Sequence, residues 1–173
     1  LFDSKGLIHP DRTNLDGKKI EFANNHAPLD ISLADCLHNA DVFIGLSKGN
    51  VLNGEMIKVM ANEPIIFALA NPTPEISYEE ALASRPDSIV ATGRSDYPNQ
   101  VNNVLGFPYI FRGALDVRSK VINEEMKLAA VLALAALAKE PVPDRVNLAY
   151  GKDNMVFGKN YIIPKPVDPR LLT

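Results

Sequence analysis

The chain has 173 residues, of which 46% are hydrophobic, and this size and composition suit a single globular domain with a sizeable core. Lys and Arg number 18 and Asp and Glu number 21, so the formal net charge is -3. Because no long basic run is present, we expect neither a nucleic-acid partner nor attraction to an anionic membrane surface. Cys36 has no second thiol for a disulfide or a C-x-x-C pair, and it is predicted to be a buried helix residue.

The ends of the chain also carry information about its class. No charged-then-apolar leader opens the sequence, which predicts a cytoplasmic protein. The first residue is Leu1 rather than Met, so the sequence resembles a fragment that begins inside an element. The Ala- and Leu-rich run 128–138 is shorter than the ~20 residues that cross a bilayer, and it is predicted to be a core helix.

In chain order, the pattern predicts an alternation of helices and short apolar strands. A helix over 29–38 leads into a strand at 42–45, and Asn53 caps the next helix. A strand at 65–69 precedes a helix that begins with Ser77 and Glu80 at capping-box spacing and runs to about Ser84. A strand at 88–91 follows, then helices over 108–117 and 123–140, and an irregular Pro-rich tail after Pro141. This rhythm indicates α/β architecture with a parallel sheet and flanking helices, in one domain.

Small or polar residues stand where each apolar run stops. The four strand ends are predicted at 3–6, 45–47, 70–72 and 92–94. In a parallel sheet all carboxyl ends of the strands share one edge, and ligands bind in the crevice outside it. The sequence therefore predicts a ligand site at this edge, and a nucleotide is the natural ligand for it.

The loop at 92–106 is rich in amides, including Asn99, Asn102 and Asn103. Amides donate and accept hydrogen bonds without adding charge, which suits a ligand that carries hydroxyl and carboxylate oxygens. The alternative is an ordinary loop whose Asn side chains cap its own backbone. Both interpretations stay open from the residues alone.

Asp3 stands where a dinucleotide-binding fold places the acid that binds the adenosine ribose, although a solvated turn residue fits equally well. The G-x-G-x-x-G phosphate loop is absent, as expected if the chain lacks its first βα unit, because that loop lies about 20 residues upstream of the acid. The three histidines have no metal-ligand spacing and are interpreted as loop or surface residues. Lys48 and Arg94 flank the predicted edge and could pair with a phosphate or carboxylate. No residue has the neighbours that a nucleophile or general base requires.

Five longer motifs occur in an order that resembles malic enzymes of the short bacterial type. They are Asp3-Ser-Lys-Gly-Leu-Ile8, Phe67-Ala-Leu-Ala-Asn-Pro-Thr-Pro-Glu75, residues 92–108, Ile110-Phe-Arg-Gly-Ala-Leu-Asp116 and Tyr161-Ile-Ile-Pro-Lys-Pro166. The resemblance spans nearly the whole chain. It implies a Rossmann-like, doubly wound NAD(P)-binding domain of an enzyme that oxidises L-malate and decarboxylates the product to pyruvate and CO2.

The resemblance also assigns roles to individual positions. Asn71, Asn102 and Asn103 are implied to bind substrate, and the cofactor is implied to contact Asp3, Leu46, Ser47, Asn71 and Asn103. The segment that contains Lys48 and Asn50 departs from the shorter Pro/Thr turn of related sequences, which weakens the assignment at Ser47. No catalytic residue and no metal ligand is assigned to this chain, because the family's base, acid and metal carboxylates belong to segments outside it.

For the whole enzyme, the resemblance implies a divalent metal, Mg2+ or Mn2+, and a homodimer or higher homo-oligomer. The isolated chain is predicted to be inactive. The choice between NAD and NADP stays open, since the acid at position 3 favours NAD while Lys5 and Arg12 are near enough in sequence to reverse that preference. Two alternatives are another Rossmann-fold dehydrogenase, of the amino-acid or methylene-tetrahydrofolate type, and a non-catalytic nucleotide-binding module.

Overall fold

The computed structural model describes residues 1–172, and these divide into two compact units. The first unit is Leu1–Ser88 and the second is Ile89–Thr173, of which the last residue lies outside the described part. Each unit is described separately below. Both contain helices and short strands, so the predicted α/β class is confirmed.

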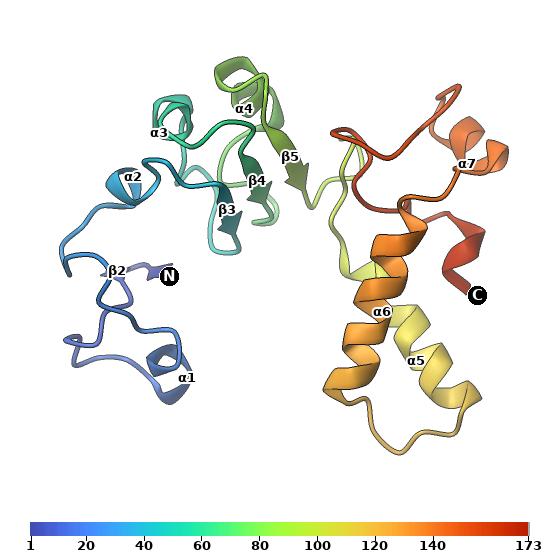
Figure 1. Ribbon diagram of the computed structural model, residues 1–173, viewed down its shortest axis with the longest axis horizontal. Helices are drawn as coiled ribbons and strands as arrows, with labels where there is room; N and C mark the ends of the chain where they lie inside the picture. Colours follow the sequence, from blue (N-terminus) through green and yellow to red (C-terminus); the bar gives the residue numbers. More distant parts are fainter. Residues whose placement is uncertain (173) are drawn as a thin grey trace. The chain divides into compact units, whose positions relative to one another are not determined.

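The centre of the first unit is a pair of parallel strands, β3 (Val42–Gly45) and β4 (Ile65–Ala68), which lie side by side in Figure 1. Val42 pairs with Ile65 and Gly45 with Ala68, so the two strands end level with each other. Alternate residues of β4 are buried, which is the pattern of a strand with one face on the core. Both strands lie at their predicted positions.

Helix α3 (Gly54–Lys58) lies between β3 and β4 in the chain, and helix α4 (Tyr78–Ser84) follows β4. Their predicted caps are confirmed: the side chains of Asn53 and Ser77 accept hydrogen bonds from the third residue of each turn. The carboxylate of Glu80 does not close a capping box, however. It accepts from the backbone N–H of Gly54 at 2.8 Å and thereby joins the starts of α3 and α4.

The helix predicted over 29–38 is wrong in length, because α2 spans only Leu33–Cys36. Ser32 is its N-cap and accepts a hydrogen bond from the N–H of Asp35, so the helix cannot begin earlier. Cys36 is partly exposed at the end of this short helix rather than buried in a longer one.

The N-terminal residues form a hairpin outside the parallel pair. Strand β1 (Phe2–Asp3) pairs antiparallel with β2 (Gly6–Leu7), and a short helix α1 (Gly17–Ile20) follows. Gly6 has a φ of +105°, which a residue with a side chain rarely adopts. The prediction that Asp3 ends a strand of the parallel sheet is therefore wrong for this structure. His9, predicted to be a loop or surface residue, lies in the loop after β2 but is buried.

The second unit begins with β5 (Ile89–Thr92), one residue later than predicted, and continues through a 3-10 turn η1 (Asn103–Leu105). Helices α5 (Phe107–Asp116) and α6 (Glu124–Leu137) confirm the two predicted helices. The tail is less irregular than predicted, since it contains α7 (Asp144–Ala149) and a second 3-10 turn η2 (Pro169–Leu172). Its order comes from a small core in which Val142, Val146 and Tyr161 are buried together.

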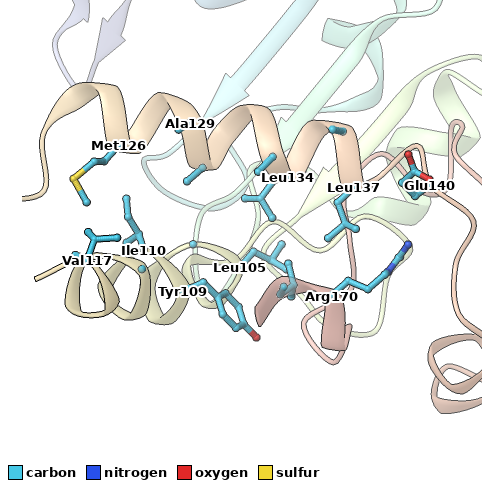
Figure 2. Close-up of a pocket in the computed structure, with 17 residues that line it drawn as sticks. Leu105, Tyr109, Ile110, Val117, Met126, Ala129, Leu134, Leu137, Glu140 and Arg170 are labelled. Atoms are coloured by element: carbon cyan, nitrogen blue, oxygen red, sulfur yellow. The ribbon is translucent and has the colours of Figure 1, made fainter. Parts of the chain in front are cut away.

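Helices α5 and α6 enclose an apolar groove of about 590 Å3, shown in Figure 2. Side chains such as Leu105 and Ile110 face Met126 and Leu134 across it. No residue of α6 is buried in the described chain, and Leu128, Val131 and Leu132 are all more than half exposed. The prediction that this segment is a core helix is thus wrong for residues 1–172.

No helix in residues 1–172 combines the length and the apolar character needed to cross a membrane.

Candidate functional site

The carboxyl ends of β3 and β4 are joined by the buried carboxylate of Glu75. One of its oxygens, Oε1, accepts from the backbone N–H of Ser47 at 3.1 Å, and the other, Oε2, accepts from the N–H of Ala70 at 3.0 Å. The side chain is fully buried. A fully buried carboxylate needs such donors, and here both come from the two loops that follow the strands. Glu75 thus fixes the spacing of these two loops.

Gly45, the last residue of β3, provides the space that Glu75 occupies. A Cβ atom at Gly45 would lie 2.3 Å from the Cδ of Glu75, far inside van der Waals contact. The N–H of Leu69 donates to the carbonyl of Gly45 at 3.0 Å, which extends the pairing of the strands by one step. A residue with a side chain would displace the carboxylate from both of its donors.

Three of the sequence-predicted site residues lie on this edge of the first unit. Leu46 and Ser47 directly follow β3, and Asn71 follows β4 after a short connection; all three are exposed. The structure therefore brings these three positions to the adjacent ends of parallel strands. Lys48 is exposed in the same loop as Ser47. Sequence reasoning missed Glu75, although its place at the end of the Asn-Pro-Thr-Pro-Glu motif was visible.

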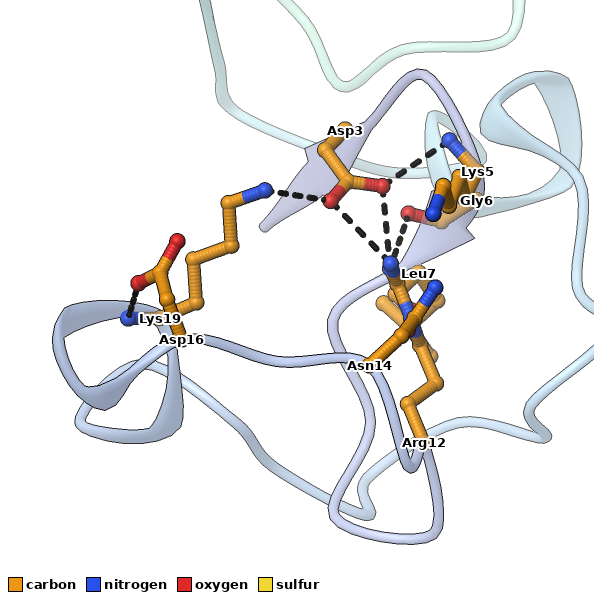
Figure 3. Close-up of polar contacts among 8 residues, drawn as sticks. All are labelled: Asp3, Lys5, Gly6, Leu7, Arg12, Asn14, Asp16 and Lys19. Carbon is orange, nitrogen blue, oxygen red and sulfur yellow. Dashed lines mark hydrogen bonds and ion pairs between the residues drawn. The ribbon is translucent and has the colours of Figure 1, made fainter.

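Asp3 lies apart from that edge in the hairpin, within a cluster of cationic groups (Figure 3). Its carboxylate receives two bonds from the Arg12 guanidinium, at 2.9 and 3.1 Å, and one from the Lys19 ammonium at 2.8 Å. The backbone N–H of Lys5 donates to it at 2.9 Å. The hydrogen bond from Arg12, followed by that from Lys19, holds the pKa of Asp3 far below its usual range.

The surroundings of Asp3 contradict one of its two sequence interpretations, that of a solvated turn residue. The Asp3 side chain is 16% exposed and the Arg12 side chain 8%, so Asp3 is not a solvated turn residue. Arg12 also donates to the backbone carbonyls of Gly6 and Leu7, which fixes it against the hairpin. Lys19 was missed because it lies 16 residues from Asp3 in sequence, on helix α1, and only the folded chain brings the two together. A single negative charge meets two positive charges here.

The amide-rich loop of the second unit divides its side chains between two tasks. The Asn102 side chain accepts from the N–H of Val104 at 3.0 Å and caps η1, which is the local capping that the alternative interpretation predicted. Asn103 is the first residue of η1 and is exposed. Arg94 pairs with Asp96 at 2.6 Å on the surface. In this loop Asn102 therefore has a structural role, whereas Asn103 is exposed.

A third amide of the loop, Asn99, is buried. Its Nδ2 donates to the carbonyls of Val90 at 3.0 Å and Lys159 at 2.8 Å, and its Oδ1 accepts from the N–H of Ile162 at 3.0 Å. Beside it, the Lys165 ammonium donates to the carbonyl of Pro98. Burial, followed by the charge of Lys152, lowers the pKa of Lys165 below its usual value.

Within residues 1–172 no group of three or more His, Cys, Asp or Glu side chains could hold a metal ion. The polar groups of these residues suit a different ligand: exposed amides at the strand ends, and a carboxylate with two cations in the hairpin. These are the groups that bind hydroxyls, carboxylates and phosphates.

Parallel strands joined through helices, with polar side chains at their carboxyl ends, define an α/β domain of the nucleotide-binding class. The family model described as "Malic enzyme, NAD binding domain" matches residues 1–149. The chain therefore belongs to the NAD-binding domain family of malic enzymes.

Curated relatives and solved structures agree with this assignment. The chain is 56% identical to the NADP-dependent malic enzyme of Halomonas elongata over 99% of its length, and 52% identical to the NAD-dependent malic enzyme of Rhizobium meliloti, also over 99%. It covers 40% of the first protein and 22% of the second, so it spans less than half the length of these relatives. The NAD-dependent malic enzyme structure from Thermotoga maritima matches 98% of the chain with a TM-score of 0.80 at 41% identity, and the chain covers 41% of it. The Rossmann-like class predicted from the sequence is confirmed.

Proposed function

We propose that this chain is the cofactor-binding part of an enzyme that converts L-malate to pyruvate and CO2 with reduction of NAD(P)+. The observation that carries the proposal is the pair of level parallel strands whose end loops, joined by Glu75, bear exposed polar groups. The names of the relatives support the same activity. The rival Rossmann dehydrogenases and the non-catalytic module have no comparable support.

The substrate would be held by uncharged amides. Asn71, Asn102 and Asn103 are proposed to bind the carboxylate and hydroxyl oxygens of malate, with Asn71 and Asn103 also contacting the nicotinamide end of the cofactor. Amide donors suit this task because they bind anionic oxygens without fixing a positive charge at the reacting carbon. NAD(P)+, when bound, supplies the hydride acceptor. Leu46 and Ser47 would line the cofactor from the end of β3.

The Asp3 cluster is proposed to bind the adenosine end of the cofactor. A carboxylate at this place accepts hydrogen bonds from ribose hydroxyls and ordinarily favours NAD. Arg12 and Lys19 surround it with two cations, at 2.9 and 2.8 Å, so the local charge is positive despite the acid. A 2'-phosphate could replace the Asp3 carboxylate as their partner. The cluster therefore accommodates NADP as well as NAD, which matches the presence of both kinds among the relatives.

Proton transfer is assigned to residues outside this chain. The Mg2+ or Mn2+ of the whole enzyme, its carboxylate ligands, and the general base and acid would come from the rest of the polypeptide, and the isolated chain is expected to be inactive. The cytoplasmic location and the homodimer or higher homo-oligomer also stay predictions.

The test is a spectrophotometric assay of the full-length protein with Mn2+. We expect malate to drive the production of NADH or NADPH, with pyruvate formed in equal amount. Lactate and glutamate serve as control substrates. Robust cofactor reduction with lactate or glutamate and none with malate would refute the proposed function. If the cofactor is not reduced with any of the three substrates, the non-catalytic module would be favoured.

Replacing Asn103 tests the proposed substrate contact. Asn103→Ala leaves an oxygen of bound malate without its donor, so kcat/KM for malate should fall by the equivalent of about 1 to 3 kcal/mol. Asn62→Ala is the matched control, since Asn62 is an exposed amide before β4, at the opposite end of that strand. Equal kcat/KM in the Asn103 variant and the wild type would remove Asn103 from the site.

A further inference from the structure

The tail of the chain contacts the loop that bears Asn102 and Asn103. The family model ends at residue 149, whereas the contacts come from residues 159–165. Loop and tail are separated by 60 to 67 residues in sequence, and both belong to the second unit. The tail motif Tyr161-Ile-Ile-Pro-Lys-Pro166 has no role in the function proposed above, so its structural partners are informative.

The buried side chain of Asn99 connects the tail to β5 by hydrogen bonds. It is 1% exposed and links the carbonyls of Val90 and Lys159 with the N–H of Ile162. Its backbone carbonyl accepts from the N–H of Thr92 at 3.1 Å. A buried amide with all of these partners tolerates little movement, because any displacement leaves a polar group unsatisfied.

Lys165 fixes the neighbouring residue of the loop. It is 4% exposed, its ammonium donates to the Pro98 carbonyl, and it lies 4.8 Å from the centre of the Tyr150 ring. Among the described residues, the ammonium of Lys165 thus contacts a carbonyl oxygen and an aromatic ring rather than a carboxylate. Burying an ammonium in this way costs free energy, so stability alone does not explain why a lysine stands here.

The loop is short between these anchors and the proposed substrate contacts. The N–H of Val101 donates to the Thr92 carbonyl at 2.8 Å, and Asn102 then caps η1 at Val104. The backbone from Pro98 to Val104 is therefore held at nearly every step. If Pro98 or Asn99 shifted, Asn103 would therefore shift by a similar amount.

We propose that Asn99 and Lys165 are positioning residues: through the 98–101 backbone they hold Asn102 and Asn103 in the orientation that binds malate. The tail after residue 149 is then part of the substrate-binding apparatus rather than a connector. This inference rests on the proposed function. Misplacing a substrate-positioning group by a fraction of an ångström lowers the rate of the chemical step, while the adenosine end of the cofactor is contacted elsewhere.

The experiment compares Lys165→Met and Asn99→Ser with the wild type in the full-length enzyme. Both variants should lower kcat/KM for malate about tenfold to hundredfold, while the Kd for NADPH or NADH, measured by fluorescence titration, changes less than about twofold. Hydrogen exchange should accelerate at the amides of 99–105 in both variants. Lys120→Met is the matched control, because Lys120 is exposed between α5 and α6.

A third variant separates positioning from folding. Lys165→Ala opens space next to a cavity of about 730 Å3 that Lys165 lines, so added propylammonium should restore part of the malate activity. Folded variants that keep the wild-type kcat/KM and hydrogen exchange would overturn the inference while leaving the proposed function intact. If Lys165→Met does not fold, the milder Asn99→Ser and the amine rescue decide the question in the same way. A wild-type enzyme inactive with malate would instead refute the proposed function.

Discussion

Two carboxylates of the first unit are satisfied in opposite ways. Glu75 is fully buried and accepts from the backbone N–H groups of Ser47 and Ala70. Asp3 is part of a hairpin and accepts from the side-chain ends of Arg12 and Lys19 as well as from one backbone N–H. The first carboxylate is thus built into the framework of the strand ends, and the second is balanced by side chains.

Because of this difference, only the Asp3 carboxylate can exchange its partners for a ligand. The donors of Glu75 are fixed by the strands, so a change there should alter stability first. The Lys19 side chain is 40% exposed, so this cation can turn toward a phosphate and leave the acid to a ribose hydroxyl without breaking a strand. We therefore expect structural effects from substitutions around Glu75 and smaller, pH-dependent effects from substitutions at Asp3.

The largest effect is expected from Gly45→Ala. The new Cβ would lie 2.3 Å from the Glu75 side chain, which is held by two hydrogen bonds and cannot move without losing them. Overpacking together with a displaced buried carboxylate should lower the free energy of unfolding by about 3 to 5 kcal/mol. Thermal and denaturant unfolding of the full-length protein would measure it.

Gly113→Ala is the control for that substitution. Gly113 lies in α5, and apart from the adjoining backbone of that helix a Cβ there would meet no atom within 4 Å. Alanine is the better helix former, so this variant should be neutral or more stable by up to about 1 kcal/mol. Equal effects at Gly45 and Gly113 would contradict the close fit between Gly45 and Glu75.

A moderate effect is expected from Glu75→Gln. The amide keeps one oxygen acceptor but places an NH2 group opposite either Ser47 N–H or Ala70 N–H, so one buried donor loses its partner. The expected loss is about 1 to 3 kcal/mol in the free energy of unfolding. Glu79→Gln is the comparison, because Glu79 is exposed in the first turn of α4. A Glu75 variant as stable as the Glu79 variant would show that water replaces the missing contact.

The sequence predicted well those features that local rules determine. Strands 42–45 and 65–69 and the caps Asn53 and Ser77 follow from periodicity and from side chains bonding to nearby N–H groups. It missed Glu75 and Lys165, because a buried charge is specified by partners distant in sequence: 28 residues separate Glu75 from Ser47, and 67 separate Lys165 from Pro98.

The errors have related causes. Helix α6 is apolar around most of its circumference, and sequence periodicity alone does not tell which surface covers it. Within residues 1–172 it lines one side of the groove with α5, and its residues Leu128, Val131 and Leu132 stay exposed. Asp3 was placed at the end of a parallel strand because its motif resembles one, whereas Gly6 turns the chain into a hairpin after it. Local sequence predicted the secondary-structure elements, whereas contacts between residues distant in sequence determine how those elements pack.

The smallest effect is expected from Asp3→Asn, and it should depend on pH. The folded-state pKa of Asp3 lies below the ordinary value of 3.8, so its ionised form stabilises the folded protein. That contribution is fully present above pH 3.8 and is lost as the pH falls toward the folded-state pKa. The variant should therefore melt lower than the wild type at pH 7, by about 2 °C or less because the cluster is near the surface, and the difference should shrink below pH 3.8. Asp116→Asn, which breaks an exposed pair with Arg112 on α5, is the control and should change the Tm less. A Tm difference for Asp3→Asn that stays constant from pH 7 to pH 3 would mean that the carboxylate contributes by its shape and hydrogen bonds rather than by its charge, and the cations around it would then not be poised to exchange it for a phosphate.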